Sequence, residues 1–137
     1  MNIKQLFEEK NGDFTEKVAG DNELKKRIED LAENGQHPLS LVITCSDSRV
    51  IPESIFSASF GELFVIRTAG NVINEGELGS IEYAVKHLHV KCIFVLGHTK
   101  CGAVHAAIHN ERGDYLAPIL SKIKSAIKDE TDEIKAA

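Results

Sequence analysis

The sequence predicts a three-layer α/β/α fold with a short, mainly parallel sheet and an N-terminal helical arm. Three largely apolar runs, residues 39–44, 63–67 and 92–96, have the length of buried strands, and helical segments separate them. Apolar strands that alternate with helices indicate a parallel sheet covered on both faces. A chain of 137 residues that is 42% hydrophobic and 27% charged is typical of one soluble globular domain.

The first 35 residues are predicted to form the helical arm. The segment ends at Asn34-Gly35, a common helix stop. Its charged residues are dense and its apolar positions are sparse. We therefore expect the arm to pack on something else, because it cannot supply a core of its own.

The α/β core is expected over residues 37–113 and a C-terminal helical segment over residues 114–137, which completes a single domain of residues 1–137. After the first strand we expect a short helix at Pro52–Ser59, with proline near its start. Apolar spacing over Glu77–Leu88 predicts an amphipathic helix after the second strand. A further helix should begin at Gly102, and the last should run from about Ala117 towards Lys135.

Composition indicates which binding partners the protein should lack and in which compartment it should be found. The formal net charge of −5 argues against a general affinity for nucleic acid or for an anionic membrane surface. No apolar run approaches the ~20 residues needed to span a bilayer. The first residues are acidic where a signal peptide would carry its apolar core, so we expect a cytoplasmic protein.

Cysteine usage favours reduced thiols. Three cysteines, Cys45, Cys92 and Cys101, cannot all pair, and a disulfide-stapled fold would need more of them. Such thiols are available for metal binding or catalysis. Cys92 opens an apolar run and is expected to be a small core residue.

Residues that can bind a metal or take part in catalysis follow two of the predicted strands. The ligand site of a parallel α/β sheet lies beyond the carboxyl ends of its strands. Cys45, Asp47 and Arg49 alternate after the first strand, and in an extended chain they would face the same side. His98 and Cys101 follow the third strand, three residues apart where a helix begins, so both can point at one spot.

These residues match a catalytic zinc site better than a structural one. Zinc prefers thiolate and imidazole ligands, and structural sites usually provide four of them. Three ligands from Cys45, His98 and Cys101, with Asp47 available as a fourth, follow the catalytic pattern. Taken singly, each cysteine is more readily explained as a core thiol and the histidine as a helix cap. The meeting of both clusters at the functional edge favours zinc.

The motifs CSDSRV, FVIRTAGNV, SIEYAV and GHTKCGAV, within about residues 39–105, resemble the β-class carbonic anhydrases. The resemblance implies that Cys45, His98 and Cys101 bind Zn²⁺, with Asp47 and Arg49 as a carboxylate–guanidinium pair beside the metal. It implies a carbonate dehydratase, which converts carbon dioxide reversibly to bicarbonate and a proton. In some members the aspartate leaves the fourth zinc position to water, and in a closed state it binds the metal itself.

The sequence departs from the family pattern in two places. Ser59-Phe60-Gly61-Glu62 stands where the plant-like branch has a glutamine before Pro-Gly-Glu, which implies a missing or different substrate contact. The family also continues into two further strands, whereas this chain stops at Ala137, which implies three parallel strands per chain. Such a sheet leaves an apolar edge, so we expect a homodimer or a higher homo-oligomer.

The sequence is also compatible with two alternative functions. The first is hydrolysis of carbonyl sulfide or carbon disulfide, because both resemble carbon dioxide in shape and the metal chemistry is shared. The second is an inactive zinc-binding homologue, which the shortness of the chain suggests.

Overall fold

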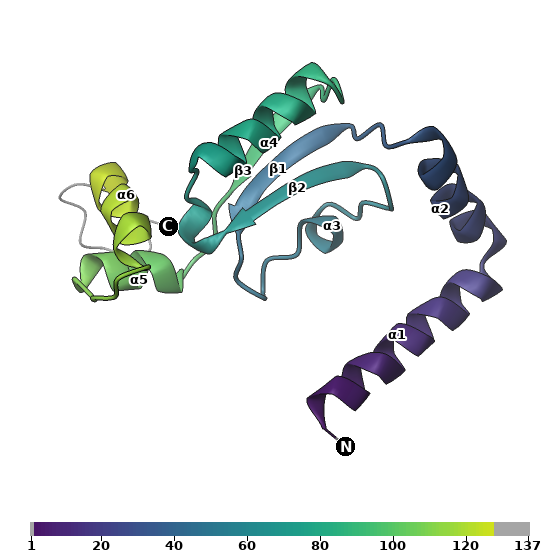
Figure 1. Cartoon of the computed structure of the whole chain (residues 1–137), viewed down its shortest axis with the longest axis horizontal. Coiled ribbons are helices and arrows are strands. Elements are labelled where there is room, and N and C mark those ends of the chain that lie inside the picture. Colours follow the sequence, from purple (N-terminus) through teal and green to yellow (C-terminus); the bar gives the residue numbers. More distant parts are fainter. Residues whose placement is uncertain (1, 128–137) are drawn as a thin grey trace. The chain divides into compact units, whose positions relative to one another are not determined.

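The computed structural model describes residues 2–127, and the chain divides into two compact units, residues 1–36 and 37–137. Figure 1 labels the elements of each unit. The predicted continuation of the last helix towards Lys135 lies outside the described residues.

The first unit is the helical arm, formed by α1 (Ile3–Gly20) and α2 (Asn22–Asn34). Asn2 caps the first helix through a capping box, and the Asp21 carboxylate accepts two backbone N–H groups at the start of the second. The second helix ends at Gly35, whose φ of 83° favours glycine. The predicted helical arm and its stop are confirmed.

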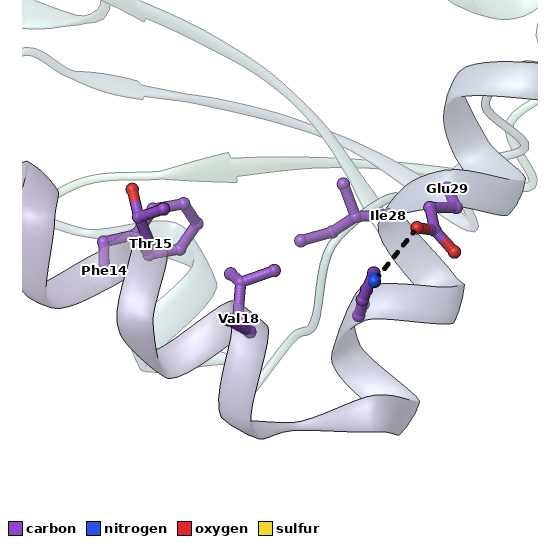
Figure 2. A pocket seen from close by; sticks show the side chains of 7 residues that line it. Phe14, Thr15, Val18, Ile28 and Glu29 are labelled. Carbon is purple, nitrogen blue, oxygen red and sulfur yellow. Dashed lines mark ion pairs between the residues drawn. The ribbon is translucent and has the colours of Figure 1, made fainter.

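A groove with a volume of about 410 Å³ runs between the two arm helices. Phe14, Val18 and Ile28 line it, and an ion pair between Lys25 and Glu29 (3.8 Å) lies beside them (Figure 2). Neither helix buries a residue among those described. The arm therefore has no core of its own, as the sparse apolar positions predict.

The second unit contains a parallel sheet of three strands, β1 (Ser40–Cys45), β2 (Leu63–Thr68) and β3 (Cys92–Leu96). The order is β2-β1-β3, and both pairs are parallel. Cys45 is paired with Thr68, and the preceding Thr44 with Leu96, so all three strands end at the same edge. The predicted parallel sheet and its common carboxyl edge are confirmed.

Helices α4 (Glu75–Lys86) and α3 (Pro52–Ile55) lie on opposite sides of the sheet (Figure 1). Helices α5 (Gly102–Ile108) and α6 (Ala117–Ile127) lie beyond its carboxyl edge and pack on each other. The α/β class is confirmed. The first short helix is shorter than expected because Ser57 takes a positive φ of 50°, which ends the helical conformation.

Two clusters of buried side chains hold this unit together. One lies between the sheet and α4 and contains Leu41, Ile43, Ile66 and Ala84. The other lies under α5 and α6 and contains Cys45, Val72, Cys101, Val104, Ala106, Ala107, Leu120 and Ile123. Because Cys45 and Cys101 belong to the second cluster, apolar packing holds their thiols in place.

The expectation of a buried third strand with a core cysteine is wrong. Cys92 is exposed, and 44% of Ile93, 43% of Phe94 and 72% of Val95 are exposed. The physical reason is position, since among the described residues β3 pairs with β1 alone and forms an edge of the sheet. Apolar character alone cannot tell an edge strand from a central one. Over residues 2–127, no helix is both long and apolar enough to cross a bilayer.

Candidate metal centre

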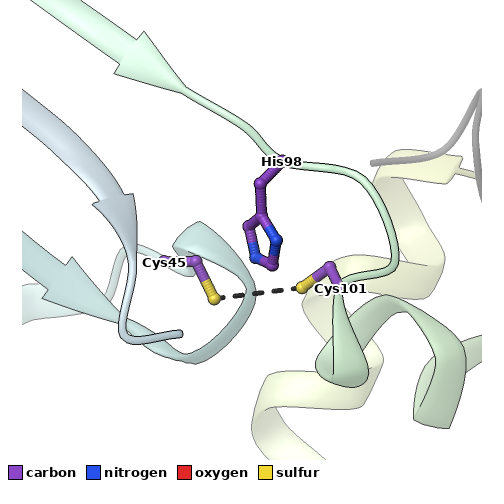
Figure 3. Close-up of side chains that lie close together, drawn as sticks. All are labelled: Cys45, His98 and Cys101. Carbon is purple, nitrogen blue, oxygen red and sulfur yellow. Dashed lines mark hydrogen bonds between the residues drawn. The ribbon is translucent and has the colours of Figure 1, made fainter. Parts of the chain in front are cut away.

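The carboxyl edge of the sheet brings Cys45, His98 and Cys101 together (Figure 3). Cys45 is the last residue of β1, His98 follows β3, and Cys101 caps α5. One ligand atom from each residue lies within 4.8 Å of the other two, and the two sulfur atoms are 3.9 Å apart. The structure therefore assembles the three residues that the sequence selects.

The imidazole of His98 is arranged as a metal ligand. Its Nδ1 lies 3.1 Å from the Thr99 carbonyl oxygen, and because that oxygen only accepts, Nδ1 carries the proton. Its Nε2 is buried and has no hydrogen-bond partner among the described residues. A buried nitrogen with a lone pair is rarely left unpaired. Beside two thiols, it fits a bound cation.

The two thiols ionise with unequal ease. Burial raises the pKa of Cys45, but the imidazole of His98 and the backbone N–H groups of Gly70 and Asp47 outweigh it, so the pKa lies below its ordinary value. The contact with His98 favours the thiolate without satisfying Nε2. Burial raises the pKa of Cys101, and the neighbouring Cys45 raises it further. Two neighbouring thiolates repel each other, and a bound cation would offset this repulsion because it stabilises both thiolates.

Asp47 and Arg49 form a bidentate ion pair beside the cluster. Arg49 Nε lies 2.9 Å from Asp47 Oδ1, and Nη2 lies 2.8 Å from Oδ2. The spacing of Cys45, Asp47 and Arg49 led us to expect an extended chain here. Instead, the Val50 N–H donates to the Asp47 carbonyl and closes a turn. The Arg49 N–H also donates to Asp47 Oδ1 (2.9 Å). A turn therefore creates the pair.

The ion pair fixes the charge of Asp47. Hydrogen bonds from the Arg49 side chain and backbone hold the pKa of the Asp47 carboxyl far below its usual range, and the positive charge of Arg49 adds to this. Asp47 is therefore a carboxylate throughout the neutral pH range, able to accept hydrogen bonds but not to supply a proton.

Arg67 is a positioning residue that sequence reasoning missed. Its Nε donates to the Cys45 carbonyl (3.2 Å) and its Nη2 to the Asp47 carbonyl (2.8 Å). Arg49 adds a second link, since its Nη2 donates to the Lys100 carbonyl (3.1 Å) in the loop that carries His98 and Cys101. The available signal was a charge at the carboxyl end of the apolar run 63–67.

Gly70 supports Cys45 from the loop after β2. Its N–H donates to Cys45 Sγ at 3.4 Å, and its φ is 65°. A Cβ at this position would lie 2.6 Å from Ile123 Cδ1 and 3.0 Å from Ala103 Cβ. The close approach and the left-handed backbone both require glycine here.

We expect Gly70→Ala to destabilise the protein by about 1–3 kcal/mol, the usual result of forcing a methyl group into a packed region. The matched control is Gly79→Ala in α4, where the added Cβ meets nothing within 4 Å. That change should stabilise the helix by about 0.5–1 kcal/mol. Urea unfolding of the three proteins checks this prediction, and equal midpoints for Gly70→Ala and the parent would contradict it.

Together the fold and the cluster define a candidate metalloprotein. It is a parallel α/β domain with two thiols and one imidazole at the carboxyl edge of its sheet. Thiolate and imidazole are the donors that zinc prefers, and three protein ligands leave a coordination position for chemistry.

Comparison with known proteins identifies the family. Residues 40–137 match the sequence model of the carbonic anhydrase family. Carbonic anhydrase 2 of Mycobacterium tuberculosis is 55% identical over 74 residues, which cover 54% of this chain and 36% of the relative. The carbonic anhydrase of Emericella nidulans is 42% identical over 105 residues, which cover 74% of this chain and 46% of the relative.

Solved structures agree with the sequence matches. The β-carbonic anhydrase of Aspergillus fumigatus superposes with a TM-score of 0.83 at 33% identity, over 98% of this chain and 68% of that one. Tetrameric β-carbonic anhydrases of Sordaria macrospora give 0.86 at 31% identity, over 99% and 73%. The chain therefore belongs to the carbonic anhydrase family, in its β class. It spans about a third to a half of the length of the two curated relatives.

Proposed function

We propose that this protein binds one Zn²⁺ through Cys45, His98 and Cys101 and catalyses the reversible hydration of carbon dioxide. The observation that carries the proposal is the convergence of the three ligand atoms within 4.8 Å, together with a buried His98 Nε2 that has no hydrogen-bond partner in residues 2–127. Family membership supports the reaction, because the relatives from Mycobacterium tuberculosis and Aspergillus fumigatus are carbonic anhydrases.

The residues of the site divide the chemistry among them. Zinc would supply Lewis acidity, which brings the pKa of water into the neutral range. Asp47, held ionised by Arg49, can accept a hydrogen bond from the attacking water and so orient its lone pair towards the carbon. Carbon dioxide carries no charge, and the apolar side chains of Val72 and Val104 in the surrounding cluster suit it.

The two thiolate ligands also affect how the turnover of carbon dioxide depends on pH. Two thiolates neutralise the formal charge of a zinc ion, so its Lewis acidity should be weaker than in a three-histidine site. We therefore expect turnover to rise with pH through the neutral and alkaline range. The rise cannot come from Asp47, because its carboxyl group ionises far below neutrality.

The test is stopped-flow hydration of carbon dioxide by protein of measured zinc content, scanned from about pH 6 to pH 9. Rates should follow zinc occupancy and increase with pH, and an added chelator that removes the metal should abolish them. Fully zinc-loaded protein with no hydration above the buffer rate at any pH would contradict the proposal and favour the inactive homologue.

Hydrolysis of carbonyl sulfide or carbon disulfide is not favoured. The apo carbon disulfide hydrolase among the structural neighbours is 23% identical with a TM-score of 0.53, a likeness that concerns the fold alone. A side-by-side assay of the gases should give a higher kcat/KM for carbon dioxide. We further propose a cytoplasmic location, because the thiols must stay reduced to bind zinc.

We also propose that the protein works as a homo-oligomer, a dimer or larger. In the arm, Ile3 and Phe7 are 76% and 63% exposed, and β3 exposes Val95 (72%) at an edge of the sheet. A second copy of the chain would cover apolar surface that each chain leaves exposed. The likeness to tetrameric β-carbonic anhydrases supports this proposal.

Light scattering at micromolar concentration should therefore give at least twice the chain mass of 15.0 kDa. Activity and mass should fall together on dilution if the assembly supports the site. A stable, monodisperse and active monomer would contradict the proposal.

A further inference from the structure

A second cluster of metal-ligating side chains lies at the end of α5, separate from the proposed zinc ligands. The rings of His105 and His109 stack with their centroids 4.0 Å apart and an interplanar angle of 21°. The Glu111 carboxylate is next to them, with Oε1 3.9 Å from His105 Nδ1. The side chains of His105 and Glu111 are each about half exposed, so the cluster is open to solvent.

The backbone at this helix end is well determined by hydrogen bonds. Asn110 takes a positive φ of 56°, its N–H donates to the Ala107 carbonyl, and the Glu111 N–H donates to the Ala106 carbonyl. This pair of bonds is the Schellman arrangement of a helix C-terminus. The backbone positions of all three residues are therefore set by the helix and its cap.

The hydrogen bonding of His109 prepares it to bind a cation. Its Nδ1 lies 2.9 Å from the His105 carbonyl oxygen, which can only accept. Nδ1 therefore carries the proton, and the lone pair of the ring is on Nε2. Metal-binding histidines typically donate their second ring nitrogen to a carbonyl or a carboxylate in this way, which fixes the tautomer and the ring.

We propose that His105, His109 and Glu111 form a second, surface site for a borderline transition-metal dication such as Zn²⁺. Histidines four residues apart share one helix face, and imidazole suits Zn²⁺, Ni²⁺ and Cu²⁺. The two rings are neighbours, with His109 held by its hydrogen bond, so binding requires the His105 side chain to turn until one of its nitrogens points at an ion on His109 Nε2. The carboxylate supplies a third donor and a compensating charge.

The site should bind more weakly than the cysteine centre. It offers exposed imidazoles where the other offers buried thiols, and water must complete its coordination. The ammonium group of Lys124 is hydrogen-bonded to Asn110 Oδ1 at 2.7 Å, and its positive charge lowers the local attraction for a cation. The proposal is independent of carbon dioxide hydration, because it concerns residues that the proposed reaction does not use.

The experiment titrates Zn²⁺ into protein that already holds one zinc ion per chain, followed by calorimetry and by NMR of the histidine rings. The parent should bind a second equivalent, with ring shifts at His105 and His109. His105→Gln and His109→Gln should each weaken this step by about 10-fold or more, since losing even a residue that only orients a metal ligand costs about this much, and Glu111→Gln should weaken it by less. His87→Gln is the matched control, because His87 is exposed, follows the end of α4 and stacks on Tyr83, and this change should leave the binding of the second ion as it is in the parent.

Separate variants keep the two metal sites distinguishable. Cys101→Ser should lose the first zinc ion and keep the second, whereas the double variant His105→Gln/His109→Gln should do the reverse. Far-ultraviolet circular dichroism establishes that each variant is folded. A parent that binds one zinc ion only, or a second equivalent that survives in the double histidine variant, would overturn the proposal.

Discussion

Replacing Cys101 or Cys45 by serine should reduce bound zinc from about one ion per chain to almost none, and carbon dioxide hydration with it. A serine hydroxyl does not ionise near neutral pH, so it cannot replace a thiolate ligand. Two remaining donors hold zinc far more weakly than three. Elemental analysis of protein dialysed against a mild chelator measures the loss directly.

Cys92→Ser is the matched control, because Cys92 is exposed at the start of β3 and belongs to neither buried cluster. It should retain full zinc and full activity. Both Cys45 and Cys101 are packed in the apolar cluster, so thermal unfolding must accompany the metal analysis. A folded Cys101→Ser protein with a full complement of zinc would refute the ligand assignment.

The order and type of the elements could be predicted because local patterns determine them. The spacing of apolar residues indicates the strands and helices, and Asn34-Gly35 ends the arm as glycine at a positive φ does. The meeting of Cys45 with the His98 and Cys101 segment follows from parallel pairing alone, since strands that run together end together.

Burial could not be predicted in the same way, because it depends on the order of strands in the sheet. The run 92–96 is as apolar as a central strand, yet it lies at an edge. The pairing of Asp47 with Arg49 was expected from their spacing in an extended chain. The two side chains do pair, but a turn of the backbone brings them together. Arg67 was missed because its hydrogen-bond acceptors are carbonyl groups, which no residue pattern reveals.

Asp47→Asn should retain zinc and lower the turnover of carbon dioxide by about 10²-fold, the effect expected when a group that orients or accepts a proton is lost. The amide keeps the size of the side chain but loses the negative charge and one acceptor of the bidentate pair with Arg49. Metal content should stay at one ion per chain, which separates this variant from the cysteine variants. Glu53→Gln, at an exposed position in α3, is the control and should leave the rate unchanged.

The pH profile of Asp47→Asn tells a positioning carboxylate from a metal-binding one. Arg49 lowers the pKa of Asp47. The ion pair therefore stabilises the folded protein fully above the ordinary pKa range of aspartate, and this stabilisation is lost only as pH falls through the lowered pKa. Between about pH 6 and pH 9 its charge is therefore constant. If Asp47 orients the attacking water, the variant should be slower by the same factor at every pH. If Asp47 instead occupies the fourth zinc position, its removal frees that position, and the activity should extend to lower pH. Unchanged rates across the whole range would exclude both roles, and with them the proposed part of Asp47 in the reaction.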